Sequence, residues 1–235
     1  MSDGVLTVAM PRGRPWSALR SLLAEAGVWP QVAEVDPERQ LLWELAGMRW
    51  VFCRPSDVIP YVREGTADLG ITGKDSLLED HQEVYELQEV DGPRWRLSLA
   101  VPRDGPPWRA LLVERGDRLR VATSYPRATR AFFARHGTQP VIVRLRGAVE
   151  LAPMVGMADC IVDMVDTGAT LAAHGLVEAE VVAPISLRVI GNQASYRWKA
   201  AEVADFCRAL GAVRPRSPHT EKGGQAPGTA PAASG

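Results

Sequence analysis

The segment with the clearest chemistry is the nonapeptide from Asp163 to Leu171, which reads Asp-Met-Val-Asp-Thr-Gly-Ala-Thr-Leu. A loop of such small and hydroxyl-bearing residues can point several backbone N–H groups, including that of Ala169, at one spot. Gly168 allows a ligand to approach the backbone, and Thr167 and Thr170 add hydroxyl donors. Loops of this kind bind phosphate without needing a lysine. The segment therefore predicts a phosphate site.

Two carboxylates lie inside this loop and need a different role. Asp163 and Asp166 would repel a bare phosphate, but they suit ribose hydroxyls or Mg²⁺. Both ligands stay open from the residues alone, and Asp163 is the better candidate of the two acids for either a ribose hydroxyl or Mg²⁺. The plainer alternative for the whole segment is a strand-to-helix turn that Thr167 or Thr170 caps.

Basic residues follow several predicted strands. Arg12 and Arg14 come after the apolar run VLTVAM, Arg54 follows Trp50 to Cys53, and Lys74 follows Gly73 after ADLGI. Ligands gather at the carboxyl ends of strands in α/β proteins, and arginine forks match phosphate oxygens. We expect these residues to meet an anionic ligand, although ordinary surface charge is the alternative for Arg12 and Arg14.

The elements that would position these residues alternate along the chain. Apolar runs bounded by Gly and Pro predict strands, and apolar residues spaced three and four apart predict helices between them. This alternation is typical of an α/β fold with mostly parallel sheets and helices on both faces. The expected strands are 5–10, 50–53, 67–71, 96–101, 118–122, 141–145 and 160–165, and the expected helices are 16–26, 57–64, 76–79, 127–136 and 150–157, the last kinked at Pro153.

Composition excludes several classes of protein. The formal net charge is −1, from 27 basic and 28 acidic residues, so nothing indicates nucleic-acid binding. No apolar run is long enough to span a membrane, and no leader peptide is recognisable, so we expect a cytoplasmic protein. The three cysteines are too far apart for a zinc site or a disulfide framework. Residues 213–235 are rich in Pro, Gly, Ala, Ser and Thr, which predicts a disordered tail.

Several motifs together resemble those of ATP phosphoribosyltransferase, the first enzyme of histidine biosynthesis. The resemblance begins with Glu150 to Pro153, Gly156 to Asp159 and the loop from Asp163, and it extends over about Val5 to Leu210. The family usually has a lysine where this chain has Arg12, which keeps the charge but changes its geometry. Other segments that agree in order and spacing are 10–14, 51–58, 67–75 and 192–195.

This resemblance implies a reaction and a fold. N1 of the adenine of ATP would attack C1′ of phosphoribosyl pyrophosphate, and pyrophosphate would leave with Mg²⁺ bound. The fold would be bilobal, like a periplasmic binding protein, with the active site in the cleft. Residues 1–92 and 175–212 would form domain I, and residues 93–174 would form domain II with the phosphoribosyl pyrophosphate loop.

The resemblance also implies roles for residues and partners. The catalytic arginines would be Arg54, Arg39 and Arg12, and the substrates would bind to Arg14, Gly73, Lys74, Glu150, Asp163, Asp166 and 167–170. The chain resembles the short form of the family, which lacks a histidine-binding domain. It would therefore form a homodimer within a hetero-octamer, together with a regulatory subunit that resembles histidyl-tRNA synthetase.

Three alternatives remain open from the sequence. A bilobal binding module would bind a small anion without turnover, because a fold does not determine a function. A phosphoribosyltransferase of the purine-salvage type usually has two adjacent acidic residues before its loop, whereas Asp163 and Asp166 are separated. An inactive paralogue, kept as a structural subunit, would be compatible with Arg12 in place of lysine.

Overall fold

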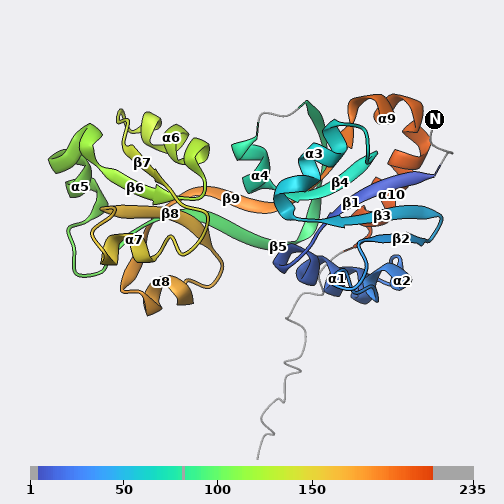
Figure 1. Cartoon of the computed structure of the whole chain (residues 1–235), viewed down its shortest axis with the longest axis horizontal. Coiled ribbons are helices and arrows are strands. Elements are labelled where there is room, and N and C mark those ends of the chain that lie inside the picture. Colours follow the sequence, from blue (N-terminus) through green and yellow to red (C-terminus); the bar gives the residue numbers. More distant parts are fainter. Residues whose placement is uncertain (1–4, 81–82, 214–235) are drawn as a thin grey trace, which may run out of the picture.

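The computed structural model describes residues 5–80 and 83–213. Within them, nine strands form one continuous sheet in the order β2-β3-β1-β4-β9-β5-β8-β6-β7. Figure 1 shows two lobes that are connected by long strands of this sheet. The strands are β1 (Leu6–Pro11), β2 (Leu42–Leu45), β3 (Met48–Cys53), β4 (Leu69–Gly73), β5 (Val84–Pro102), β6 (Arg120–Thr123), β7 (Val141–Arg144), β8 (Cys160–Val165) and β9 (Leu176–Asn192).

Helices cover both faces of the sheet in each lobe. The first lobe carries α1 (Arg14–Ala26), α2 (Pro30–Ala33), η1 (Pro55–Asp57), α3 (Val58–Arg63), α4 (Lys74–Glu79), α9 (Gln193–Trp198) and α10 (Ala200–Gly211). The second lobe carries α5 (Trp108–Arg115), η2 (Gly116–Arg118), α6 (Pro126–Arg135), α7 (Leu151–Met154) and α8 (Ala169–Ala173).

Each lobe has its own apolar core, divided by the sheet. In the first lobe α1, α2 and α10 pack on one face and α3 on the other. In the second lobe α5 and α6 pack on one face and α7 and α8 on the other. Successive side chains of strand β1 point to opposite faces of the sheet, so Val8 and Met10 pack in the core on one face while Ala9 packs in the core on the other.

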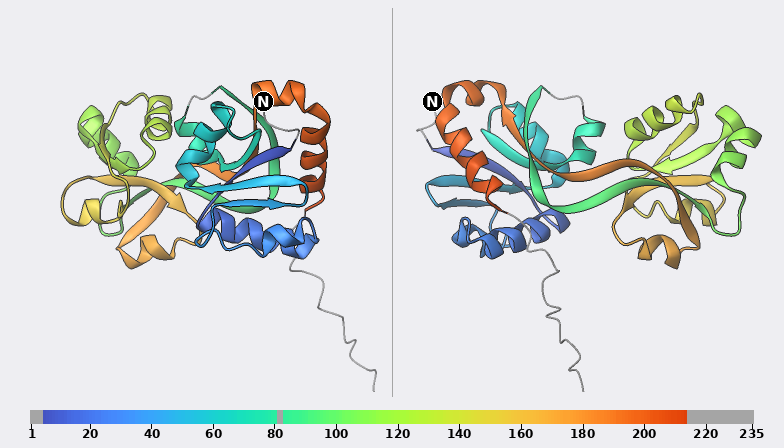
Figure 2. Two further views of the ribbon diagram at one scale, coloured as in Figure 1. Left: turned by 45° about the vertical axis from the view of Figure 1, so that its right-hand side comes forward. Right: turned by 180° about the vertical axis from the view of Figure 1, so that it is seen from behind.

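The two lobes are connected by a ribbon of β5 and β9. These long strands pair antiparallel from Val84–Asn192 to Pro102–Leu176, with register shifts along the way, and Figure 2 shows them crossing between the lobes. Trp95 lies at the crossing and packs against the cores of both lobes. The chain thus passes from the first lobe to the second along β5 and returns along β9.

The α/β class and bilobal fold expected from the sequence are confirmed. The sheet is mixed, because β1–β3, β1–β4, β6–β7 and β6–β8 pair parallel, whereas β2–β3, β4–β9, β5–β8 and β5–β9 pair antiparallel. Helix α7 ends one residue after Pro153 instead of continuing with a kink. The domain boundaries at residues 92 and 175 stay a prediction, since β5 and β9 run unbroken through both lobes.

Most of the expected tail lies outside the described residues. Its first residue, Val213, is fully buried in the core of the first lobe, where its N–H donates to the carbonyl oxygen of Leu210. The ordered chain therefore reaches at least to Val213.

A buried polar network holds the edge of the first lobe together. The Asp68 carboxylate accepts hydrogen bonds from the Thr7 N–H at 2.8 Å, the Ser195 hydroxyl at 2.6 Å and the Lys199 ammonium at 2.8 Å. Asn192 caps α9 by accepting from the N–H groups of residues 194 and 195. The motif residues Asp68, Asn192 and Ser195 thus join β1 and β4 to α9, and none of them lines the cleft.

Candidate functional site

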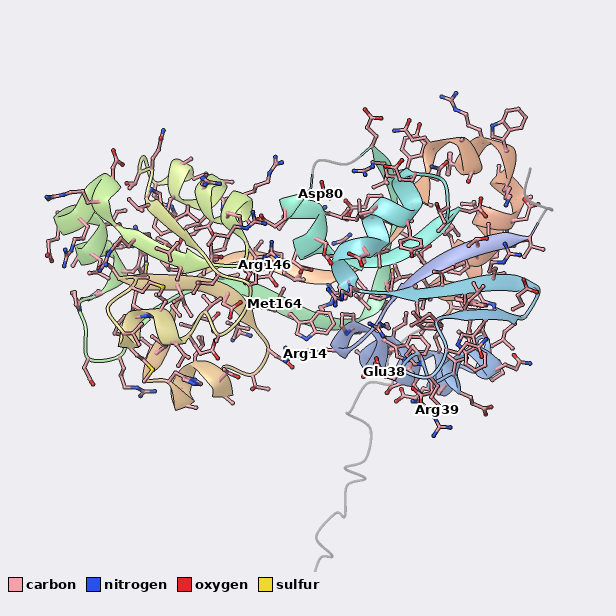
Figure 3. The ribbon with its side chains drawn as sticks, in the orientation of Figure 1. Arg14, Glu38, Arg39, Asp80, Arg146 and Met164 are labelled. Atoms are coloured by element: carbon pink, nitrogen blue, oxygen red, sulfur yellow. The ribbon has the colours of Figure 1, made fainter. Side chains whose placement is uncertain are left out.

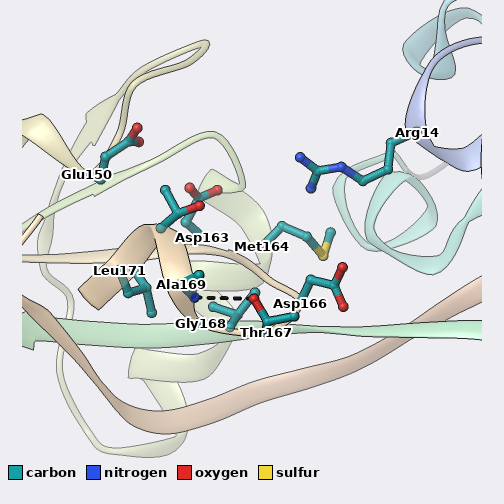
Figure 4. Close-up of a pocket in the computed structure, with 11 residues that line it drawn as sticks. Arg14, Glu150, Asp163, Met164, Asp166, Thr167, Gly168, Ala169 and Leu171 are labelled. Atoms are coloured by element: carbon teal, nitrogen blue, oxygen red, sulfur yellow. Dashed lines mark hydrogen bonds between the residues drawn. The ribbon is translucent and has the colours of Figure 1, made fainter. Parts of the chain in front are cut away.

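The two lobes face each other across a pocket of about 480 Å³. Its floor and one wall are the loop from Asp163 to Leu171, and Arg14 reaches it from the opposite lobe (Figure 4). The parallel strands β1, β3 and β4 of one lobe and β6 and β8 of the other all end toward the cleft, as expected for an α/β ligand site. The pocket brings together Arg14, Glu150, Asp163, Asp166, Thr167, Gly168, Ala169 and Thr170, all of which the sequence predicts as ligand-binding residues.

The backbone of the loop is shaped by one glycine. Gly168 has φ 84° and ψ −1°, in the left-handed region that suits a residue without a Cβ. The Thr167 hydroxyl accepts a hydrogen bond from the Ala169 N–H at 3.3 Å (Figure 4), which holds the turn. Helix α8 is only five residues long, so its dipole is small. Any anion at this loop must therefore be held mainly by individual N–H groups and hydroxyls.

The pocket carries more negative than positive charge. Among the described residues, Glu150, Asp163 and Asp166 line it together with one cation, Arg14. Burial raises the pKa of Asp163, and the Glu150 charge adds to the rise, while a backbone hydrogen bond from Met164 and the Arg14 charge oppose it. A bare polyanion would be repelled here. A ligand that combines hydroxyl groups with a metal-neutralised phosphate fits the charges better.

A second pocket of about 260 Å³ adjoins the first and shares Arg14 and Met164 with it. Both lobes contribute mainly apolar walls, and Trp95 lies on the ribbon between them. Such a surface suits a planar organic group. Its other lining residues are Pro11, Pro15, Pro55, Gly73, Asp75, Ser76, Tyr125, Ile185 and Leu187.

Two polar side chains of this second pocket come from opposite lobes. Tyr125 follows β6 and Asp75 belongs to α4, and the two side chains lie close enough for each to affect the pKa of the other. Burial raises the pKa of both groups, and the Asp75 charge adds to the rise for Tyr125, so the phenol stays protonated at neutral pH. The Asp75 carboxylate folds back over Gly73, where an added Cβ would come within 2.0 Å of Oδ1. A side chain at position 73 would therefore displace the Asp75 carboxylate, although the φ of Gly73, −75°, is ordinary.

A further contact between the lobes lies one helical turn along α4. The Glu79 carboxylate accepts hydrogen bonds from the N–H groups of Arg127 at 3.0 Å and Ala128 at 2.8 Å. These groups belong to the first turn of α6, where helices leave N–H groups unpaired. Glu79 therefore caps a helix of the other lobe and ties that helix, with the adjoining Tyr125, to the first lobe.

The remaining predicted residues lie outside the first pocket. Arg12 bonds to Glu38 at 3.5 Å, Lys74 to Glu86 at 2.6 Å, and Arg54 is exposed immediately before Pro55 of the second pocket. Arg39 is 87% exposed and pairs with Asp36 at 3.3 Å. Figure 3 shows Arg39 at the outer margin of the first lobe, away from Arg14 and Met164 at the cleft.

Asp75 and Tyr125 line the second pocket but were not predicted as site residues from the sequence. Asp75 and Tyr125 follow β4 and β6 closely, so the rule that ligands gather at carboxyl ends of strands applied to them as well. Trp95, one of three tryptophans that could line a cleft, reaches the second pocket because the ribbon crosses between the lobes there.

The described residues contain no group of three or more His, Cys, Asp or Glu side chains placed to hold a metal ion. Within residues 5–80 and 83–213 no helix is long and apolar enough to cross a membrane.

Known proteins resemble this chain over most of its length. The family model for ATP phosphoribosyltransferase (HisG) matches residues 54–212. The ATP phosphoribosyltransferase of Symbiobacterium thermophilum is 42% identical over 207 residues, covering 87% of this chain and 93% of the relative.

Solved structures show the same relationship. The ATP phosphoribosyl transferase (HisG:HisZ) complex from Thermotoga maritima contains a chain that is 30% identical, with a TM-score of 0.72 and coverage of 89% of this chain and 98% of that one. The periplasmic aliphatic sulphonate binding protein SsuA from Escherichia coli shares the fold alone, at 13% identity and a TM-score of 0.58 over 89% of this chain and 72% of that one.

Proposed function

Since this chain belongs to the ATP phosphoribosyltransferase family, we propose that its 163–171 loop holds phosphoribosyl pyrophosphate and that the adjoining apolar pocket holds the adenine of ATP. The enzyme transfers the 5-phosphoribosyl group to N1 of ATP and releases pyrophosphate, the first step of histidine biosynthesis. The main support for the proposal is that the 163–171 loop and Arg14 line one pocket, and that a second, mainly apolar pocket adjoins it.

The reaction needs positioning more than acid–base chemistry. The N1 lone pair forms a bond to C1′ while the bond from C1′ to the pyrophosphate oxygen breaks, and its electron pair leaves on pyrophosphate. No proton must be removed for this step. The contribution of the protein is therefore to align N1 with C1′ and to stabilise the departing negative charge.

Each group in the first pocket has a place in this scheme. The loop N–H groups and the hydroxyls of Thr167 and Thr170 donate to the 5′-phosphate, and Asp163 and Glu150 accept hydrogen bonds from ribose hydroxyls. Arg14 faces the loop from the other lobe and meets the pyrophosphate. Mg²⁺ would neutralise part of the pyrophosphate charge, and we assign Asp163 as the carboxylate that would contact it.

The other predicted residues are assigned to the rim of the site. Arg12 and Arg54 follow strands that end at the cleft and would approach the leaving group when the lobes close. Gly73 and Lys74 begin α4 and would meet the nucleotide. Arg39 lies far from the cleft of its own chain, so we assign it to the cleft of a second subunit in a homodimer.

A mixing experiment tests this assignment of Arg39. The variants Arg39→Ala and Asp163→Asn should each be nearly inactive alone, because each lacks one half of every composite site. Hetero-dimers formed on mixing should regain up to about one quarter to one half of the activity, since one of their two sites is intact. Full activity of Arg39→Ala alone would remove Arg39 from the catalytic machinery.

The larger assembly is a proposal as well. The Thermotoga maritima structure is a complex of HisG with HisZ. We assign to this chain a comparable cytoplasmic assembly, in which its homodimers join a regulatory subunit that resembles histidyl-tRNA synthetase in a hetero-octamer. Co-purification from the native cell, followed by mass measurement of the intact complex, tests this. A purified chain that remains a dimer beside the candidate regulatory subunit would contradict it.

A further inference from the structure

A single guanidinium behind the loop holds both the ribbon and the loop backbone. The Nε and Nη2 atoms of Arg96 donate to the two carboxylate oxygens of Glu178 at 2.5 and 2.6 Å, and Nη1 donates to the carbonyl oxygen of Asp166 at 2.8 Å. Arg96 lies on β5 directly opposite Val165, the last residue of β8. The strand register therefore places this guanidinium where the loop begins.

Glu178 sets the orientation of the guanidinium. It belongs to β9 and also accepts a hydrogen bond at 2.8 Å from the hydroxyl of Ser98, which is fully buried on β5. The hydrogen bonds from Arg96 lower the pKa of Glu178, so the carboxylate stays ionised. A two-pronged arginine–carboxylate pair is rigid, and the third donor is thereby aimed at the loop.

The hydrogen bond to Asp166 determines which way a peptide group faces. In a planar trans peptide the C=O and the following N–H point in opposite directions. Because the Asp166 carbonyl points at Arg96, the Thr167 N–H points away from it. Asp166 and Thr167 line the first pocket, whereas Arg96 does not. We propose that Arg96 is a positioning residue that turns the Thr167 N–H toward the phosphate of phosphoribosyl pyrophosphate.

This inference rests on the proposed role of the loop and adds to it a residue outside the pocket. Without Arg96, the Asp166–Thr167 peptide would be free to rotate and present its carbonyl oxygen to the phosphate. That would replace a donor by an acceptor at an anion site and weaken binding.

The same lobe contains a matched control. Arg120 donates through Nη2 to Asp159 at 3.0 Å and through Nη1 to the carbonyl oxygen of Gly156 at 2.9 Å. The chemistry repeats that of Arg96, but Asp159 precedes β8 while Asp166 follows it. Arg120 therefore supports the end of the strand remote from the loop, and it lines neither pocket.

The experiment compares Arg96→Lys with Arg120→Lys by steady-state kinetics and by thermal unfolding with and without phosphoribosyl pyrophosphate. A lysine can reach the carboxylate or the carbonyl but cannot fork to both. Arg96→Lys should raise the KM for phosphoribosyl pyrophosphate about tenfold and shrink the thermal shift that this substrate causes, while the KM for ATP stays unchanged. Arg120→Lys should lower Tm in buffer without changing either KM.

Glu178→Gln serves if Arg96→Lys does not fold, because it keeps Arg96 but loosens its orientation, and it should raise the same KM by a smaller factor. If the wild-type enzyme is active and the Arg96→Lys and Glu178→Gln variants keep its KM for phosphoribosyl pyrophosphate, the inference is overturned and the proposed function stands. The same conclusion follows if Arg120→Lys raises this KM as much as Arg96→Lys does. A wild-type chain that does not bind phosphoribosyl pyrophosphate would overturn both.

Discussion

Replacing Gly168 by alanine separates the cost of a strained backbone from the cost of blocking a ligand. Gly168 has φ 84°, and an added Cβ would meet no atom of the protein within 4 Å. The loss of stability therefore comes from the left-handed backbone alone, about 1–2 kcal/mol for an L-residue. For a domain of this size, that lowers Tm by roughly 2–8 °C.

The functional effect should be larger than this strain implies. Under the proposed role of the loop, a methyl group at position 168 would keep at least one backbone N–H from reaching the phosphate. A hydrogen bond to a charged group contributes about 1.5–3 kcal/mol. The KM for phosphoribosyl pyrophosphate should therefore rise about tenfold to a hundredfold, while the KM for ATP stays near its normal value.

Gly137→Ala is the matched control. Gly137 has φ 72°, an added Cβ there also meets nothing within 4 Å, and it follows the end of α6 that is remote from the cleft. It should show the same fall in Tm and normal kinetics. The reasoning is refuted if Gly168→Ala keeps the normal KM, or if Gly137→Ala raises it to the same extent.

The other predictions concern groups beside and beneath the site. Glu79→Ala removes the cap on α6, so the free energy of unfolding measured in urea should fall by about 1 kcal/mol. An unchanged free energy of unfolding would show that this contact does not stabilise the fold. Asp68→Ala leaves the buried Thr7 N–H without its acceptor and should cost about 1–3 kcal/mol, with normal KM values in the folded fraction. Altered KM values would contradict a purely structural role. The raised pKa of Asp163 means that affinity for phosphoribosyl pyrophosphate should fall as the pH drops through that pKa, and Asp163→Asn should abolish this dependence in titration calorimetry. The effect on folding stability has the opposite sign, because a raised folded-state pKa means that protonation of Asp163 stabilises the fold below its unfolded pKa and that this contribution is lost as the pH rises. Asp163→Asn should therefore be more stable than wild type at neutral pH but not at acid pH. The reverse order of stabilities would refute this prediction.

The pocket-lining loop from Asp163 to Leu171 could be singled out from the sequence because its residues are contiguous. Strand β8, the small residues after it and the two acids all lie within Cys160 to Leu171. The strands and helices near it were recognisable for the same reason, since periodicity is a local property. Arg14 could also be predicted, because it directly follows a buried strand.

What the sequence could not show depends on pairing between distant segments. The ribbon has half-buried strands with register shifts, so β5 and β9 lack a clean alternation and their full lengths were not recognisable. The contact of Asp75 with Tyr125 depends on how the two lobes face each other. Arg39 shows the converse, because its motif position indicated a catalytic role while the fold places it on the outer surface of its own subunit.

The most direct test of the central claim is the release of pyrophosphate by the purified chain, alone and with the proposed regulatory subunit, supplied with Mg²⁺ and with ATP and phosphoribosyl pyrophosphate separately and together. Mass spectrometry of the nucleotide product accompanies the assay. We predict release only when both substrates are present, a product that combines ATP with one phosphoribosyl group, and almost no turnover by Asp163→Asn. Folded wild-type protein that binds phosphoribosyl pyrophosphate but forms no such product, with or without the regulatory subunit, would contradict the account.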